Sequence, residues 1–284
     1  MAKAWREGRF DFQGIRYRYL SWGSASRTQA PVVLLHGFAQ SARAWSEVAE
    51  ALADRWPVYA FELVGHGGSQ VPANALPYTL TAQGETLLAF LGHVAPPSAK
   101  PVVVGYSMGG RVALKAARRD PHAFGALVLE SAGLGPVSAA EREAAYRRDI
   151  ANARRVREAG LEAFMDAWER MPLFATQRVL PAEIRARVRA GRLANDAEAL
   201  ARTFEHAGQH VMPDRRETLA TFDALAKAGV PVLYLAGELD QKYRALADSL
   251  VETSVQTRIV ACVGHNIHLE SPRAFVEALG MVVR

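Results

Sequence analysis

The sequence contains a serine whose neighbours could make it chemically reactive. Ser107 is the central residue of the pentapeptide G-Y-S-M-G at 105–109, which follows the apolar run 101–104 and precedes the helix-compatible segment 111–117. A strand, then G-x-S-x-G, then a helix is the arrangement of a nucleophile elbow. The two glycines permit a tight turn that lifts the hydroxyl clear of the sheet, beside the free N–H groups of a helix N-terminus. We therefore predict that Ser107 is catalytic.

A serine hydroxyl needs an imidazole to accept its proton, and the imidazole needs a carboxylate to orient it. His265 follows the apolar run 259–263 and a glycine, so we expect it on the loop after the last strand. It is our candidate for the base. His268 is the weaker candidate because it lies further toward the following helix, where it could pack or form a hydrogen bond beneath the site.

The carboxylate has three candidates. Asp240 lies past the apolar run 232–235, at the start of the next helix, and is the favoured acid. Glu238 competes with it but sits earlier in the same turn. Glu130, after the run 127–129, ranks behind Asp240.

Negative charge that develops during catalysis needs two backbone N–H donors, which form an oxyanion hole. We expect one from Met108, directly after the serine, and the other from Phe38, on the loop after the run 32–35. His36 on that loop is expected to be structural. His66 has no acidic or cysteine partners at metal-ligand spacing, so the sequence predicts no metal site. No motif suggests a cofactor.

These residues must be positioned by an α/β architecture. Residues 9–22 alternate between apolar and polar side chains around a turn at 13–14, which predicts a hairpin at a sheet edge. Short apolar runs then alternate with helix-length segments, and this favours a mostly parallel central sheet flanked by helices on both faces. The predicted strands are 32–35, 58–63, 102–104, 126–129, 232–235 and 258–263, and the predicted helices between and after them are 42–54, 79–94, 109–119, 242–252 and 272–283.

The alternation stops between residues 134 and 228. This segment is rich in Ala, Glu and Arg, and its periodic stretches predict helices at 139–158, 161–170, 181–191 and 196–207. We interpret 134–228 as a helical cap inserted into a core formed by 1–133 and 229–284. Such a cap would lie over the carboxyl ends of the strands, where ligands bind in open α/β sheets.

Composition limits the classes of function. The chain has 284 residues, 50% of them hydrophobic, and a net charge of +5. No basic run interleaved with aromatic residues is present, so nucleic acid is not an expected partner. Neither a secretory signal nor an 18-residue apolar stretch is found, and the single cysteine, Cys262, fits a cytoplasmic location. Arginine supplies most of the positive charge, which favours a pocket for a small polyanion.

Together these motifs resemble the α/β-hydrolase superfamily. The resemblance rests on H-G-F at 36–38, G-H-G-G-S at 65–69, the elbow, G-E-L-D at 237–240 and G-H at 264–265. It implies the α/β-hydrolase fold and the chain order serine, acid, histidine. Two departures are Glu62, where the superfamily commonly has aspartate, and Val64, where proline is frequent.

A narrower resemblance extends into the cap. The segments G-Y-S-M-G-G-R at 105–111, L-E-S at 129–131, W-E-R-M-P-L-F at 168–174, G-E-L-D-Q-K at 237–242 and G-H-N-I-H-L-E-S-P at 264–272 are similar to those of the menaquinone-pathway lyases called SHCHC synthases. Their full name is 2-succinyl-6-hydroxy-2,4-cyclohexadiene-1-carboxylate synthase. The family eliminates pyruvate from a cyclohexene precursor that carries several carboxylates.

That resemblance implies a small polycarboxylate as substrate and assigns the site residues. Ser107, Asp240 and His265 would be catalytic, and the serine would act as a base. The implied substrate contacts are Tyr106, Arg111, Arg147 or Arg148, Trp168 and Arg192. The same triad could instead serve a serine hydrolase acting on esters or carbon–carbon bonds. A catalytically silent ligand-binding fold ranks last because all three triad members are present. Sequence alone does not indicate the oligomeric state.

Overall fold

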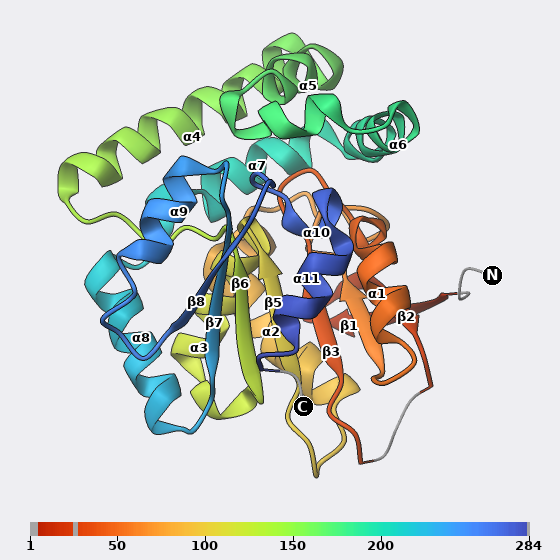
Figure 1. Cartoon of the computed structure of the whole chain (residues 1–284). Helices are drawn as coiled ribbons and strands as arrows, with labels where there is room; N and C mark the ends of the chain where they lie inside the picture. Colours follow the sequence, from red (N-terminus) through yellow and green to blue (C-terminus); the bar gives the residue numbers. More distant parts are fainter. Residues whose placement is uncertain (1–4, 25–27, 283–284) are drawn as a thin grey trace.

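The computed structural model describes residues 5–24 and 28–282, which form an eight-stranded sheet with helices on both faces and a helical cap above it (Figure 1). The order of the strands is β1-β2-β4-β3-β5-β6-β7-β8. The pairs β1–β2 and β2–β4 are antiparallel and the remaining pairs are parallel. The strands are β1 (Arg6–Phe12), β2 (Ile15–Trp22), β3 (Val32–Leu35), β4 (Val58–Phe61), β5 (Val102–Tyr106), β6 (Ala126–Glu130), β7 (Val232–Gly237) and β8 (Gln256–Val260). The predicted α/β-hydrolase fold is thereby confirmed.

The parallel strands and the antiparallel hairpin at the sheet edge differ in burial. Every residue of β3, β5, β6 and β7 is buried, as expected for parallel strands covered on both faces. The β1–β2 hairpin lies at the sheet edge and is more exposed, and it turns through Gln13 and Gly14, which both have positive φ.

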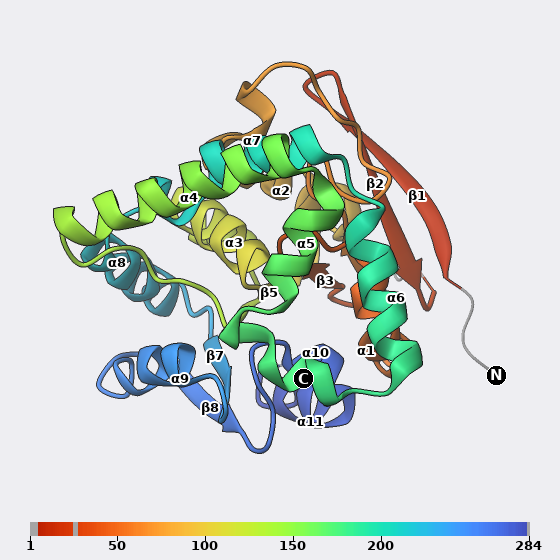
Figure 2. The ribbon, with the colours of Figure 1, turned by 90° about the horizontal axis from the view of Figure 1, so that it is seen from above.

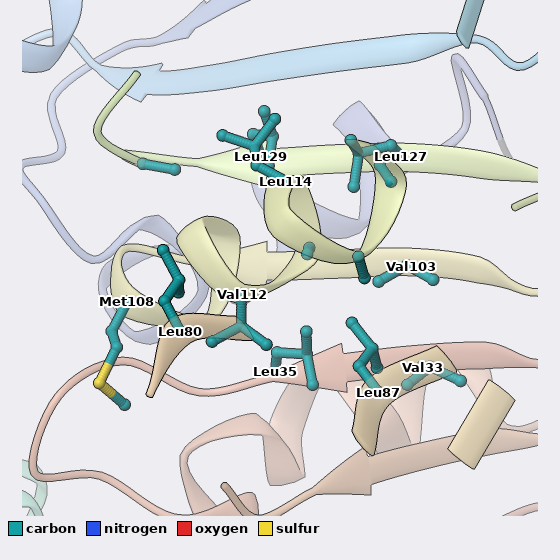
Figure 3. Packing of buried hydrophobic residues seen from close by; sticks show 14 of the residues in the cluster. Val33, Leu35, Leu80, Leu87, Val103, Met108, Val112, Leu114, Leu127 and Leu129 are labelled. Atoms are coloured by element: carbon teal, nitrogen blue, oxygen red, sulfur yellow. The ribbon is translucent and has the colours of Figure 1, made fainter. Parts of the chain in front are cut away.

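Two helical layers cover the sheet. One face carries α2 (Leu80–Val94), α3 (Met108–Arg119), α8 (Arg215–Lys227) and α9 (Gln241–Asp248), and the other carries α1 (Ser46–Leu52) and α11 (Pro272–Leu279). Figure 3 shows Val112 and Leu114 of α3 pointing at the side chains of Leu35 and Leu129 on the sheet. Burial of this apolar surface fixes α3 directly behind β5, so the turn that joins them is held on both sides.

The cap consists of α4 (Ala139–Ala159), α5 (Leu161–Glu169), the 3₁₀ segment η4 (Pro172–Val179), α6 (Ala182–Leu193) and α7 (Ala197–Ala207). Seen from above, α4 and α7 lie side by side, and α5 and α6 lie over the end of the sheet (Figure 2). The cap has an apolar cluster of its own, which includes Phe164, Met165, Leu200 and Phe204. In the residues that the structure describes, no helix is both long and apolar enough to span a membrane.

Two expected boundaries differ from the structure. The cap was predicted to extend to residue 228, but α8 packs against α3 and β7, and its Phe222 and Leu225 belong to the core cluster beneath the sheet. The last strand was predicted to reach Val263 but ends at Val260, because Cys262 adopts a positive φ of 61° and turns the chain. The cap therefore ends before α8, and the loop that carries His265 is longer than predicted.

The departure at Glu62 has a structural explanation. Glu62 is fully buried after β4 and accepts hydrogen bonds from the Arg18 guanidinium at 2.7 and 2.8 Å. It also accepts from the backbone N–H groups of Ala42, at 3.1 Å, and Gly68, at 2.6 Å. This carboxylate ties three segments of the core together, and it is paired as a buried charge must be.

Candidate active site

Ser107 lies on a strained turn between β5 and α3. Its φ of 49° and ψ of −103° are unusual for a residue with a side chain. A Cβ on Gly109 would lie 2.5 Å from the Leu35 carbonyl oxygen, and one on Gly105 would lie 2.6 Å from Gly110. Both glycines are therefore required by close packing, and the predicted nucleophile elbow is present.

The structure brings the three predicted catalytic residues together. His265 Nδ1 donates to Asp240 Oδ2 at 2.7 Å, and His265 Nε2 lies 3.4 Å from Ser107 Oγ. Asp240 caps α9 and also accepts from the Tyr243 backbone N–H at 3.4 Å. Because the Nδ1 proton is committed to the carboxylate, Nε2 is free to accept the serine proton. This is the geometry of a Ser-His-Asp triad.

The competing acids and histidine have other partners. Glu238 accepts from the backbone N–H of Cys262 at 2.9 Å. Glu130 accepts from His268 twice, from the backbone N–H at 3.0 Å and from Nδ1 at 2.6 Å, and both side chains are fully buried. Trp45 stacks on the His268 ring at 3.8 Å. Glu130 and His268 thus form a second carboxylate–histidine pair beneath the site.

Glu270 holds the loop that presents His265. It accepts hydrogen bonds from the N–H groups on both sides of the histidine, Gly264 at 2.7 Å and Asn266 at 3.3 Å. Burial raises the pKa of Glu270, and these hydrogen bonds oppose the increase. The loop is therefore fixed by a carboxylate that does not touch the imidazole.

The second predicted oxyanion donor lies on the loop after β3. Phe38 lines the same cavity as Ser107, and Met108, buried, is the first residue of α3. His36 is structural, as predicted: its Nδ1 donates to the Gly37 carbonyl at 2.8 Å and its Nε2 accepts from the Leu63 N–H at 3.1 Å. Burial lowers the pKa of His36 to about 4, so the ring is neutral at pH 7.

A cavity of about 190 Å³ lies between the triad and the cap. The predicted contacts Tyr106 and Trp168 line it together with Ser107 and His265. Four cationic side chains also line it, and each comes from a different helix: Arg111, Arg148, Arg192 and Lys242. Among the described lining residues the one carboxylate is Asp149, which already accepts from His210 Nδ1 at 2.9 Å.

Arg111 is the most informative of these cations. Its Nε is buried and has no hydrogen-bond partner among the described residues. Burial lowers the pKa of this guanidinium, and the nearby charge of Asp149 only partly compensates. A desolvated cation without a paired anion is unfavourable by itself, so it is typical of a site that receives an anion.

Arg192 is held in place within the cap. Its guanidinium donates to Glu169 at 2.9 Å and to Gln177 at 3.0 Å, and it lies 5.1 Å from the centre of the Phe174 ring. Its side chain is only 6% exposed. Three neighbours therefore orient the Arg192 guanidinium at the edge of the cavity.

Of the two alternatives Arg147 and Arg148, the structure places Arg147 outside the cavity. Its side chain is 76% exposed and pairs with Glu143 one turn away at 2.8 Å, and it does not line the cavity. Its neighbour Arg148 does line it, because adjacent residues of a helix point about 100° apart. Lys242 was not predicted as a site residue, although it falls two residues after Asp240, in the first turn of α9 and therefore at the active-site end.

Three further hollows adjoin the site, and one of them, of about 350 Å³, shares Gln40 and Arg192 with the cavity. Another of about 310 Å³ between α4 and α9 shares Arg148 and Lys242 with the catalytic cavity. The third, of about 480 Å³, lies within the cap and is lined by arginines and acids, with no serine or histidine. Across the described part of the chain, no cluster of His, Cys, Asp and Glu residues could hold a metal ion.

The fold and the triad define a class of protein. Residues 32–278 match the model of the alpha/beta hydrolase family, and the chain belongs to that family.

Within it, the chain is similar to proteins of one particular kind. It is 34% identical over 256 residues, 89% of the chain and 93% of the relative, to 2-succinyl-6-hydroxy-2,4-cyclohexadiene-1-carboxylate synthase of Citrobacter koseri. It is also 34% identical over 264 residues, 92% of each protein, to a Bacillus subtilis protein provisionally given the same name. The structure of MenH from S. aureus aligns with a TM-score of 0.84 and 28% identity, covering 94% of this chain and 99% of that one. The chain therefore belongs to this synthase family.

Proposed function

We propose that the protein is a carbon–oxygen lyase that forms 2-succinyl-6-hydroxy-2,4-cyclohexadiene-1-carboxylate, SHCHC, in menaquinone biosynthesis. Its substrate would be 2-succinyl-5-enolpyruvyl-6-hydroxy-3-cyclohexene-1-carboxylate, from which it eliminates pyruvate. The observation that carries the proposal is Arg111, whose Nε is buried and has no hydrogen-bond partner among the described residues, and which lines the same cavity as Ser107. A substrate with several carboxylates supplies the anions that this cavity lacks.

The triad would supply the base. Ser107 Oγ takes the proton from the ring carbon that bears the succinyl group, while His265 Nε2 takes the serine proton and Asp240 stabilises the imidazolium. The negative charge spreads onto the succinyl carbonyl oxygen, where the N–H groups of Phe38 and Met108 would stabilise it. A water-poor, partly closed cavity strengthens each of these interactions.

Pyruvate leaves in the second half of the reaction. The electron pair from the broken C–H bond moves through the ring double bond, which creates the conjugated diene and breaks the bond between the ring and the enolpyruvyl oxygen. The departing enolate takes up a proton on carbon and becomes pyruvate. Ser107 already carries the proton from the ring carbon, so the extra proton on His265 passes to the departing enolate, directly or through solvent, and the enzyme ends unchanged.

The cations would bind the carboxylates and not take part in proton transfer. Arg111 lies one turn after the elbow, with its backbone N–H bonded to the Ser107 carbonyl at 3.3 Å, so it is fixed relative to the base. Arg148, Arg192 and Lys242 approach from α4, α6 and α9. Cations on separate helices can hold separate carboxylates and so orient the ring above the serine.

The direct test is to follow pyruvate release from the enolpyruvyl precursor and, in parallel, hydrolysis of short p-nitrophenyl esters. We expect pyruvate from the wild type, none above background from Ser107→Ala, and poor turnover of the esters. Ester hydrolysis without pyruvate release would refute the lyase proposal and leave a serine hydrolase that uses the same triad.

A further inference from the structure

Asn195 connects the cap to the loop that carries the second oxyanion donor. It lies between α6 and α7 and is buried. Its side-chain Nδ2 lies 3.1 Å from the carbonyl oxygen of Ala39, the residue directly after Phe38. The same Nδ2 lies 3.0 Å from the Gly191 carbonyl and 3.1 Å from the Arg192 carbonyl at the end of α6. One amide therefore joins the helix that bears Arg192 to the loop after β3 that carries Phe38 and Ala39, which we call the oxyanion loop.

The orientation of this amide follows from its surroundings. Three carbonyl oxygens surround Nδ2, so only the donor end of the amide fits there. The Oδ1 atom at the other end is buried and has no partner among the described residues. A buried oxygen without a partner is unfavourable, so the gain from Asn195 lies in the bonds that its nitrogen donates.

Apolar packing also connects the oxyanion loop to the cap. Ala39 is fully buried within the cap's apolar cluster, next to residues such as Leu200, and has a positive φ of 55°. The Phe38 ring lies 4.3 Å from that of Phe204 and 5.1 Å from that of Trp168, measured between centres. The end of the oxyanion loop thus packs as part of the cap.

The beginning of the loop is held by the core instead. His36 Nε2 accepts from the backbone N–H of Leu63, just after β4, at 3.1 Å, and His36 Nδ1 donates to the Gly37 carbonyl at 2.8 Å. Phe38 lies between the segment held by the core and the segment held by the cap. The direction of its N–H therefore depends on both attachments.

We propose that Asn195 is a positioning residue that fixes the oxyanion loop from the cap, so that the oxyanion hole is complete only when the cap is seated. This inference rests on the roles proposed above for Phe38 and Ser107. Asn195 acts through the Ala39 carbonyl and touches no reacting atom. The Arg192 guanidinium keeps its bonds to Glu169 and Gln177 without it, so loss of Asn195 should lower kcat more than it raises KM.

A second contact between cap and core supplies the matched control. Arg187 on α6 donates to Glu47 on α1 at 2.7 Å, and both side chains are more than half exposed. This ion pair joins the same helix to the core but does not reach the oxyanion loop. Arg187→Ala therefore removes one exposed contact between cap and core, which contributes little to stability, and leaves the bond from Asn195 to Ala39 in place.

The test uses a fluorophosphonate, which reports on the oxyanion hole whatever the natural substrate is. Ser107 Oγ displaces fluoride from phosphorus while His265 takes the serine proton, and the phosphoryl oxygen lies where the oxyanion would. We expect Asn195→Ala to lower the labelling rate and kcat for pyruvate release about tenfold, with KM changed less than threefold. Asn195→Asp should be slower still, because its carboxylate would face three carbonyl oxygens. Arg187→Ala should label at the rate of the wild type.

All rates are compared at a temperature where each variant is folded by circular dichroism. If Asn195→Ala and Asn195→Asp label as fast as the wild type, the proposal is wrong. It is also wrong if Asn195→Asp matches the wild type while Asn195→Ala is slow, since that would show that only the volume of the side chain matters. A wild type that is labelled but releases no pyruvate would refute the proposed function and leave this inference standing.

Discussion

The catalytic cavity has two parts that are built differently. Its floor consists of residues at or near the ends of parallel strands, namely Ser107 after β5, Asp240 after β7 and His265 after β8. Its cations project from four helices, two of them in the cap. In the floor Ser107, His265 and Asp240 are linked by short contacts, whereas the Nε of Arg111 has no hydrogen-bond partner among the described residues.

This difference between the floor and the cations corresponds to two tasks, orienting the base and binding the substrate. A base must be oriented before the substrate arrives, and the hydrogen bond that His265 donates to Asp240, with the contact between His265 and Ser107, provides this orientation. A binding cation must keep donors free for the ligand, at a cost in desolvation. Changes in the floor should therefore reduce the rate of chemistry, and changes among the cations should reduce affinity.

The first way to break the comparison contrasts two of the carboxylate–histidine pairs, Asp240–His265 and Glu130–His268. His265→Ala should lower kcat by about 10³-fold or more, because the base is lost. His268→Ala should instead lower the free energy of unfolding by about 3 kcal/mol, since it leaves the buried Glu130 carboxylate without its partner. Steady-state kinetics and urea unfolding measure the two effects. A folded, fully active His265→Ala enzyme would contradict the assignment.

The second prediction tests Arg111, whose Nε has no hydrogen-bond partner among the described residues. Arg111→Met keeps much of the apolar stem and removes the charge, so kcat/KM for the polycarboxylate should fall about 100-fold, mainly through KM. Because burial already lowers the pKa of this guanidinium, its loss should leave the free energy of unfolding unchanged or raise it by about 1 kcal/mol. Lower stability together with normal affinity would show that Arg111 is structural.

The third prediction concerns the pH dependence of stability that arises from His36, on the loop after β3. Burial lowers the pKa of His36 to about 4 from an ordinary value of 6.5, so the folded state favours the neutral ring. That stability is fully present above pH 6.5 and is lost as the pH falls toward 4. From pH 7 to pH 5 the loss should be about 2 kcal/mol for this group. Urea unfolding of the wild type and His36→Gln at both pH values measures it.

His66 should add to the same pH dependence. Burial lowers the pKa of its ring to about 3, with a further decrease from the nearby His36. His36→Gln should therefore reduce the loss of stability at pH 5 without abolishing it. An unchanged pH dependence in this variant would show that His36 is not one of the groups responsible.

The smallest expected effect separates two neighbouring arginines. Arg148→Ala should raise KM about tenfold, because its side chain lines the cavity. Arg147→Ala should change KM less than twofold, because this exposed side chain pairs only with Glu143. Kinetics of the two variants under one set of conditions give the comparison. Equal effects would mean that general positive charge on α4, and not a defined contact, attracts the substrate.

The two parts also differed in how far the sequence could predict them. The parallel strands fix which residues emerge at the carboxyl edge, so Ser107 could be placed from the G-x-S-x-G motif between a strand and a helix, and His265 from an apolar run followed by a glycine. The choice between Asp240 and Glu130 depended on which histidine each carboxylate meets, and the structure pairs Glu130 with His268. Local sequence carries no signal for such long-range pairing.

Helix-borne residues were harder to predict. One position along α4 separates Arg148, which lines the cavity, from Arg147, which faces solvent. Lys242 falls within the quoted segment 237–242 but was given no role, because local sequence does not show that its side chain reaches the cavity. Asn195 has no sequence signature, since its role comes from the contact with Ala39, 156 residues away.

The most direct test of the account separates binding from chemistry in one experiment. Binding of the enolpyruvyl precursor and single-turnover release of pyruvate are measured for the wild type, Ser107→Ala and Arg111→Met. The account predicts that Ser107→Ala binds the precursor as tightly as the wild type and releases no pyruvate. Arg111→Met should bind it about 100-fold more weakly and still release pyruvate when saturated. Release of pyruvate by Ser107→Ala, or normal binding by Arg111→Met, would contradict the account.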